Sequence, residues 1–468
     1  MNGASVLSDI APGDRLTGAH GTLVVSASGT LSALVRDATG VVRAAAAGDG
    51  FAADIADAVR AGDASSMSVS SGRLVVVLSA GAAESHSGEP VQSSVAGSVR
   101  SGAGAGARAG ARERAIAVDM TNWSVAVESD NADLIDVVKV VGSWGGADRA
   151  ARQLTRIEKR GAGIIPPFIG RLDWEHPERG TSTIALVSCL IAGAEDGWTW
   201  AVDDVLAFAA GGPEPGWPAR VGTLAAEMHR ALLAFADAAA PPPAGTALRA
   251  RAEATLDEAL RVTDGPAGVR LRNRAAALRA VIAGIPDHSP ARVFDLHGDF
   301  HVGQVLRSPA ASGGLTEHDY WVIDFDGDPQ LDDVDRDRAD FSARDVAHVL
   351  TSIDLVGAVA MRRLGSALPL VRDWAARARV QLLTAYRDAL AASSVAATSV
   401  GDSLDERMLE GFIVEQLLRE LIYAHRYLQR WQYAPDAVIT FSYPLTPGLD
   451  AGMLTEEEPW TPPVFTTT

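Results

Sequence analysis

The sequence has little lysine and almost no cysteine. Only Lys139 and Lys159 occur among its 468 residues, so the position of each lysine is informative. Cys189 is the single cysteine, which excludes an intramolecular disulfide and a metal site built from several thiolates. Its place in the apolar run IALVSCLIAG indicates a small buried side chain.

Long apolar runs and excess positive charge are also missing. No basic segment followed by an apolar stretch opens the chain, and no run of about 18 apolar residues occurs, so we expect a cytoplasmic protein with no membrane partner. The formal net charge of −18 argues against nucleic acid as a partner, because nucleic acid is bound chiefly by lysine and arginine. With 47% hydrophobic residues, the chain can bury cores in roughly two to four domains or subdomains.

The first half of the chain alternates between strand-like and flexible composition. Short strand-like segments and one amphipathic stretch predict a small α+β cap subdomain at 1–90. Ser, Gly, Ala and Arg dominate 91–114, which is typical of a flexible linker. The segments AIAVDM, WSVAVES and LIDVVKVVG, a helix-like stretch at 147–160 and strand-like segments near 183–192 and 198–202 predict a β-rich N-lobe at 115–202.

The second half is mainly helical in pattern. Apolar residues recur at helical spacing in the segments 203–210, 217–238, 246–262, 266–284, 343–364, 369–393 and 404–431. Strand character returns only around 292–325, as VFDL, QVLR and YWVIDF. We therefore expect an α+β protein whose C-lobe, at 203–468, is mainly helical.

Two short motifs on the strands of the C-lobe carry chemistry: HGDFHVGQ at 297–304 and IDFDGDP at 323–329. Phosphoryl transfer from ATP needs a carboxylate near the acceptor hydroxyl and ligands for Mg²⁺. In the protein-kinase catalytic loop an Asp is followed five positions later by a metal-binding amide, and a later strand ends in a metal-binding Asp-Phe-Gly. Here Asp299 precedes Gln304 at that spacing, and Asp324 follows the strand. Asp299 is the candidate base, and Gln304 and Asp324 are candidate Mg²⁺ ligands.

The N-lobe supplies candidates for binding the phosphates. Lys139 lies in the middle of a strand with apolar neighbours, where a kinase places its phosphate-binding lysine, although a lysine on an edge strand would look similar. Thr121, Asn122 and Ser124 belong to a tight connection whose amides and hydroxyls could cover the phosphates. A plain hairpin turn is the alternative.

The two histidines of the first motif are expected to have structural roles. His297 is expected to pack and hydrogen-bond so that it holds the loop. His301 is expected to be structural or to lie near the nucleotide.

The two motifs, together with SARDVAHVL at 342–350, resemble the bacterial maltokinases and the wider aminoglycoside-phosphotransferase-like kinases. The resemblance runs through most of the chain. It implies a bilobal protein-kinase-like fold with a small cap before the N-lobe. It also implies that Asp299 is the base, that Gln304 and Asp324 bind Mg²⁺, and that ATP is the co-substrate.

Departures from the maltokinase pattern concern the acceptor. This chain has DFDGDP where maltokinases usually have DFEGEP, and Gln416 and Arg419 stand where the maltose site has lysine and tyrosine. The pattern EQ…E..YA…L.RW.Y.P resembles the actinobacterial glucosamine kinases. That resemblance implies phosphorylation of the 6-hydroxyl of glucosamine.

Acidic residues near the expected acceptor cleft suit an ammonium sugar. Asp345, Glu415 and Glu420 could attract the amine, and Trp431 offers a face to a sugar ring. The ordinary alternatives are a surface pair between Glu415 and Arg419 and a core position for Trp431.

Three further interpretations stay open at this point. Maltose or an aminoglycoside could be the acceptor, and the chain could be an inactive nucleotide-binding module, although Asp299 and Asp324 are both retained.

The expected N-lobe helix has no Glu at 147–157, so either Glu158 pairs with Lys139 or another group holds the lysine. We expect a monomer or weak homodimer that binds a small amino sugar and ATP.

Overall fold

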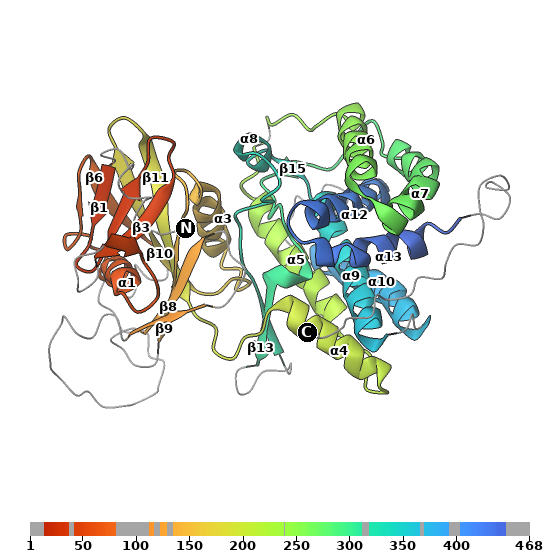
Figure 1. Cartoon of the computed structure of the whole chain (residues 1–468), viewed down its shortest axis with the longest axis horizontal. Coiled ribbons are helices and arrows are strands. Elements are labelled where there is room, and N and C mark those ends of the chain that lie inside the picture. Colours follow the sequence, from red (N-terminus) through yellow and green to blue (C-terminus); the bar gives the residue numbers. More distant parts are fainter. Residues whose placement is uncertain are drawn as a thin grey trace. The chain divides into compact units, whose positions relative to one another are not determined.

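The computed structural model describes residues 14–36, 42–80, 112–116, 122–128, 134–237, 239–310, 318–365, 369–392 and 403–445. The chain forms two compact units, Met1–Ala192 and Gly193–Thr468. In Figure 1 the first unit carries long strands and the second carries most of the helices.

The N-terminal unit begins with an antiparallel sheet of five strands in the order β4-β3-β2-β1-β5. These strands are β1 (Asp14–Thr17), β2 (Thr22–Val25), β3 (Leu31–Arg36), β4 (Val42–Ala44) and β5 (Ser68–Val69). Helix α1 (Phe51–Ala61) follows β4 and buries Phe51, Ile55 and Val59, which recur at helical spacing. The helix ends at Gly62, whose φ of 67° is left-handed and favours glycine.

A second antiparallel sheet in the same unit has the order β6-β10-β11-β9-β8-β7. Its strands are β6 (Arg73–Leu78), β7 (Glu113–Ala115), β8 (Trp123–Glu128), β9 (Ile135–Val140), β10 (Phe168–His176) and β11 (Gly180–Cys189), and helix α3 (Asp148–Lys159) packs on β10 and β11. Strand β6 comes from the expected cap and yet pairs with β10 of the expected N-lobe. Most of the expected linker lies outside the described residues, and its last residues, Glu113 and Arg114, belong to β7.

The C-terminal unit is built around a long buried helix, α9 (Ala343–Leu364), whose residues are buried along most of its length. Helices α4, α10, α12 and α13 all pack against α9. The other helices are α4 (Gly197–Ala209), α5 (Trp217–Leu233), α6 (Gly245–Val262), α7 (Gly265–Ala283), α8 (Asp333–Arg336), α10 (Pro369–Ala391), α12 (Leu409–Arg426) and α13 (Tyr433–Ser442). None of the helices in the described part of the chain combines the length and apolar composition of a membrane span.

Two small strand pairs place the chemical motifs in this helical unit. Strand β12 (Val293–Phe294) pairs with β15 (Asp340–Phe341), and β13 (Val305–Pro309) pairs with β14 (His318–Val322). The first motif fills the segment between β12 and β13, including the 3₁₀ turn η2 (Val302–Gln304), and the second motif follows β14. The amide of Ile323 donates to the carbonyl oxygen of Gln304 over 3.0 Å, so the two motifs lie side by side.

Two segments differ from the sequence-based expectation. The expected strand at 198–202 is the start of α4, because the Asp196 carboxylate accepts a hydrogen bond from the Thr199 amide at 3.1 Å and caps the helix. The two units consequently divide after Ala192, and not after Val202. The expected helix at 404–431 is broken into α12 and two 3₁₀ turns, η3 (Glu406–Met408) and η4 (Gln429–Trp431).

Candidate active site

His297 holds the two motifs of the C-terminal unit together. Its Nε2 donates to the carbonyl oxygen of Ile323 at 2.9 Å, and its Nδ1 accepts from the Asp299 amide at 3.3 Å. The ring is fully buried and lies 4.7 Å from the ring of Phe325. This histidine therefore has the structural role that the sequence predicts, and it fixes Asp299 relative to Asp324.

The carboxylate of Asp345 fixes the same loop from helix α9. Its two oxygens accept the backbone amides of His297 and Gly298, each at 2.9 Å, and Oδ2 also lies 3.2 Å from Nε2 of His229. Burial by itself raises the pKa of Asp345, but the hydrogen bond from His229 and the amide of Gly298 lower it overall. Asp345 is thus a positioning residue of the loop, which differs from the expected contact with the acceptor.

Asp299 lies in an acidic environment that is largely shielded from water. Its carboxylate oxygens lie 3.7 Å from Nδ1 of His348 and 3.9 Å from Nε2 of His301. Burial raises the pKa of Asp299 well above its ordinary value, and the charges of Asp328, Asp324 and Glu420 add to that rise, whereas Arg419 opposes it. When Asp299 is ionised, its raised pKa makes it a stronger proton acceptor. A cation bound beside it stabilises this ionised form.

The two histidines beside Asp299 stay neutral. Burial and the neighbouring His297 lower the pKa of His301 to about 4, and its Nδ1 accepts from the Gly303 amide at 3.0 Å. Burial, followed by the neighbouring His301 and Arg419, lowers the pKa of His348. His348 was missed by sequence reasoning, although it lies in SARDVAHVL, one helical turn after Asp345.

Gln304 and Asp324 come together as the sequence predicts. Nε2 of Gln304 lies 3.5 Å from Oδ2 of Asp324. Asp324 has a φ of 63°, a left-handed conformation that is costly for a residue other than glycine and that is concentrated at functional sites. In the described part of the chain, no group of three or more His, Cys, Asp or Glu side chains could hold a metal ion. Two oxygen-donating side chains still suit Mg²⁺, which usually takes its other ligands from water and phosphate.

Glu420, on helix α12, forms one wall of this acidic site, where it lies 3.9 Å from Nε2 of His348. Nε1 of Trp431 donates to one carboxylate oxygen at 2.8 Å, and Nε2 of Gln416 donates to the other at 3.2 Å. Burial raises the pKa of Glu420, although the hydrogen bonds from Trp431 and Gln416 oppose the rise. The structure therefore brings Glu420 and Trp431 together, as expected for a sugar site.

An aromatic side chain that sequence reasoning missed supports this wall. The ring of Trp198 lies 5.4 Å from that of Trp431, edge to face, and 5.8 Å from that of His301. Trp198 belongs to α4, in the segment expected to be a strand, and no motif indicated its position.

Glu415 and Arg419 do not form the surface pair considered from the sequence. Glu415 is buried, with Oε1 at 3.0 Å from Nε of Arg251 and Oε2 at 3.1 Å from Nη1 of Arg344. Arg419 instead pairs with the buried carboxylate of Asp328 in the second motif. Glu415 therefore ties helix α12 to neighbouring segments, because each of its carboxylate oxygens is paired with an arginine.

The candidates for phosphate binding lie in the N-terminal unit. Lys139 and Ser124 face each other directly across strands β9 and β8. Strand β9 lies between β11 and β8, which excludes the alternative of a lysine on an edge strand. The Ser124 hydroxyl is buried without a hydrogen-bond partner among the described residues, and Oδ1 of Asn122 accepts from the Gly142 amide at 3.2 Å. Thr121 lies outside the described residues.

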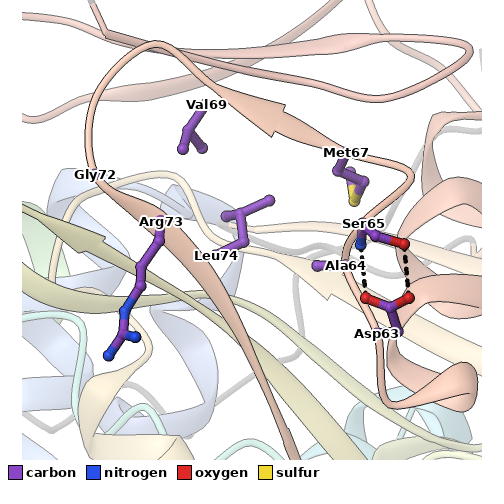
Figure 2. Close-up of a pocket in the computed structure, with 8 residues that line it drawn as sticks. All are labelled: Asp63, Ala64, Ser65, Met67, Val69, Gly72, Arg73 and Leu74. Atoms are coloured by element: carbon purple, nitrogen blue, oxygen red, sulfur yellow. Dashed lines mark hydrogen bonds between the residues drawn. The ribbon is translucent and has the colours of Figure 1, made fainter.

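A cavity of about 450 Å³ lies elsewhere in the N-terminal unit, beside β5 and β6 (Figure 2). The Asp63 carboxylate on its wall is taken up by the amide and hydroxyl of Ser65, at 2.9 and 2.6 Å. Arg73 pairs with Glu175 on the surface. These occupied groups give the cavity no cluster suited to phosphoryl transfer.

Two relatives of known activity match most of this chain. A glucosamine kinase of Streptacidiphilus jiangxiensis is 34% identical over 335 residues, which cover 70% of this chain and 73% of that protein. A glucosamine kinase of Mycolicibacterium smegmatis is 33% identical over 335 residues, covering 70% of this chain and 78% of its own. No family model matches the sequence.

A solved structure extends the similarity to nearly the whole chain. A glucosamine kinase in complex with glucosamine, ADP and inorganic phosphate is 31% identical, with a TM-score of 0.67 and coverage of 95% of this chain and 97% of that one. The expected α+β, protein-kinase-like fold is thereby confirmed. Because both the sequence and the fold match over most of their length, this chain belongs to the actinobacterial glucosamine kinase family and is a phosphotransferase.

Proposed function

We propose that this protein transfers the γ-phosphoryl group of ATP to the 6-hydroxyl of glucosamine. Asp299 accepts the proton of that hydroxyl while the hydroxyl oxygen bonds to phosphorus, and the bond from phosphorus to the leaving oxygen breaks to release ADP. The observation that carries the proposal is the partly buried acidic site, where His348 lies within 4 Å of both Asp299 and Glu420 and both carboxyl groups have raised pKa values.

The electrostatics of that site favour an amino sugar over a neutral one. The carboxylates of Asp324, Asp328 and Glu420 act on Asp299, and Arg419 is the cation that acts on it in the opposite direction. An ammonium group entering this site relieves the repulsion among the carboxylates, whereas a neutral hydroxyl in the same place does not. In the proposal, Glu420 binds the amine and Trp431 packs against the sugar ring.

The same relief prepares the base for reaction. A bound cation stabilises the ionised form of Asp299 and so lowers its pKa toward the ordinary range. The cationic substrate thus shifts Asp299 to the form that can take the hydroxyl proton. A neutral sugar would leave more of Asp299 protonated.

The proposal also assigns the phosphates of ATP and the metal ion to particular residues. Lys139, Thr121, Asn122 and Ser124 are proposed to bind the phosphates of ATP, and Gln304 and Asp324 would hold Mg²⁺. The buried and unpaired Ser124 hydroxyl opposite Lys139 supports this assignment. Bound Mg²⁺ would neutralise charge that develops on the phosphates during transfer. We further propose a cytoplasmic location and a monomer or weak homodimer.

Maltose, an aminoglycoside and an inactive module are the other candidates. One solved relative that covers 95% of this chain is a glucosamine kinase in complex with glucosamine, ADP and inorganic phosphate. Arg419, where maltokinases have tyrosine, is occupied by its pair with Asp328. No observation specifically favours the alternatives.

The proposal is tested by ADP release with glucosamine, glucose, maltose, N-acetylglucosamine and kanamycin, followed by ³¹P–¹H correlation NMR of the product. We expect turnover on glucosamine, with phosphorus coupled to the protons at C6. Asp299→Asn, which keeps the shape of the side chain, should lower kcat by at least about 100-fold, because general-base catalysis contributes roughly 10²–10⁴-fold. Turnover on maltose without glucosamine, phosphate at another carbon, or full activity in Asp299→Asn would contradict it.

A further inference from the structure

A chain of buried hydrogen bonds leads from Asp345 away from the active site. His229, on α5, places Nε2 at 3.2 Å from Oδ2 of Asp345, and its Nδ1 lies 2.8 Å from the hydroxyl of Tyr386, on α10. All three residues have at most 1% of their surface exposed. In the C-terminal unit, helix α10 packs against both α5 and α9. Water therefore has little access to replace any of these contacts.

The partners determine which nitrogen of His229 carries the proton. Asp345 keeps a lowered pKa and accepts two backbone amides, so its ionised oxygens can only accept. Nε2 of His229 must then donate to Asp345. In a neutral imidazole the other nitrogen is an acceptor, which suits the Tyr386 hydroxyl as donor.

We propose that Tyr386 and His229 are positioning residues for phosphoryl transfer, because they fix the tautomer and orientation of the imidazole that supports Asp345. Asp345 in turn holds the amides of His297 and Gly298, next to the base Asp299. We call the hydrogen-bonded series Tyr386, His229 and Asp345 the relay. The relay sets where Asp299 lies, although neither Tyr386 nor His229 touches a reacting atom. The inference rests on the proposed role of Asp299 as base.

A positioning role predicts an effect on kcat more than on binding. A misplacement of about 1 Å at the reacting atoms can cost roughly 100-fold in rate. Tyr386→Phe removes only the hydroxyl and leaves Nδ1 of His229 without its donor. We expect kcat to fall by about 3- to 10-fold, which is less than the roughly 100-fold loss for a full misplacement because Asp345 keeps its other contacts. The KM values for ATP and glucosamine should change less than about twofold.

Two further variants separate a relay from general packing. His229→Gln keeps an N–H that can reach Asp345 but removes Nδ1, the acceptor of the Tyr386 hydroxyl. In the double variant with His229→Gln and Tyr386→Phe, the additional loss of the Tyr386 hydroxyl should therefore have little effect on kcat. The fall in kcat of the double variant should be smaller than the sum of the two single effects on a free-energy scale. Tyr443→Phe is the control, because Tyr443 is a half-buried tyrosine of the same unit whose pKa is also raised but whose charged neighbours are Glu410 and Arg379. It should leave kcat unchanged.

The tautomer is tested independently of catalysis. Long-range ¹H–¹⁵N correlation NMR of the full chain, with the His229 signals identified by their loss in His229→Gln, should show a protonated Nε2 and an unprotonated Nδ1. A protonated Nδ1, full kcat in Tyr386→Phe, or additive losses in the double variant would overturn the relay. A wild-type protein that does not turn over glucosamine would instead overturn the proposed function, because the NMR result does not depend on the acceptor.

Discussion

At the scale of single residues, Arg419 balances the charge of the proposed active site. It pairs with Asp328, and both side chains are largely buried, with 12% and 4% of their surface exposed. It also lowers the pKa of Asp299 against the neighbouring carboxylates. One guanidinium thus supports both the folding of the second motif and the ionised state of the base.

Replacing Arg419 with methionine should affect stability and pH dependence together. Leaving the Asp328 charge buried and unpaired should reduce the free energy of unfolding by about 3–5 kcal/mol, measured by urea denaturation at neutral pH. Because the guanidinium no longer lowers the pKa of Asp299, the acidic limb of the kcat profile should move to higher pH. In the proposed mechanism activity requires deprotonated Asp299, so the loss of activity should be greatest in acid and smaller in alkali.

A matched arginine in an exposed ion pair provides the control. Arg387 pairs with Glu406, and both side chains are about two-fifths exposed, at 42% and 41%. Arg387→Met should change stability by less than about 1 kcal/mol and should leave the pH profile in place. An unchanged acidic limb in Arg419→Met would argue against the electrostatic role of Arg419.

The residues of the two motifs could be predicted because spacing along the chain constrains them directly. Gln304 and Asp324 do meet, and His297 does hold the loop. The roles of Asp345 and Glu415 could not be read in the same way, since their partners come from distant segments. The sequence shows an acidic residue on a helix, but it does not show that His229 or Arg251 reaches it.

At the scale of elements, the contact between α4 and the turn η2 supports the segment that carries the proposed metal ligand Gln304. Gly197 begins α4 and lies so close to this turn that a Cβ atom would fall 1.7 Å from the carbonyl oxygen of Val302. Gly303 of the same turn is equally confined, with Nε1 of Trp198 only 2.5 Å from where its Cβ would be. Glycine at both positions lets the helix approach the segment that carries Gln304.

Gly197→Ala should therefore move α4 away from η2. The added methyl group must displace backbone, so we expect a loss of about 1–3 kcal/mol in unfolding free energy and a lower kcat. Thermal and urea unfolding measure the first effect, and ADP release measures the second. Gly216→Ala is the control, because nothing lies within 4 Å of the corresponding Cβ position.

The control should change stability by less than about 0.5 kcal/mol. Equal behaviour of the two alanine variants would show that the approach of α4 to η2 is unimportant. A difference between the two variants would report on the contact between α4 and η2, since neither Gly197 nor Gly216 is proposed to touch a substrate.

Most helices could be predicted from periodicity, because their buried faces repeat at helical spacing. Helix α9, for example, has the same bounds as the expected segment at 343–364. The start of α4 was missed because Trp198 and Trp200 alternate with smaller residues, as in a strand. The segment is helical in the structure, where the Asp196 carboxylate accepts a hydrogen bond from the Thr199 amide and caps the helix. Strand β10 and helix α13 were not expected at all, since neither carries a strong local signal.

At the scale of the whole molecule, the proposed tasks are divided between the two units. Lys139 and Ser124 belong to the N-terminal unit, whereas the proposed base, metal ligands and acceptor residues belong to the C-terminal unit. Composition predicted a cap at 1–90 that is separate from the N-lobe, but it did not show that β6 of this cap belongs to the sheet of the N-lobe. Strand β6 joins that sheet through its pairing with the distant β10. Such pairing depends on register across many residues and is not encoded in a local pattern.

The central claim is that a buried acidic site selects an amino sugar, and one comparison of kcat/KM tests it most directly. Glucosamine and glucose are measured with the wild-type protein and with Glu420→Gln, which keeps the shape of the side chain but removes its charge. A hydrogen bond to a charged group contributes about 1.5–3 kcal/mol, so the wild type should prefer glucosamine by roughly 10- to 150-fold. The preference should largely disappear in Glu420→Gln. Equal use of both sugars by the wild type, or an undiminished preference in the variant, would contradict the account.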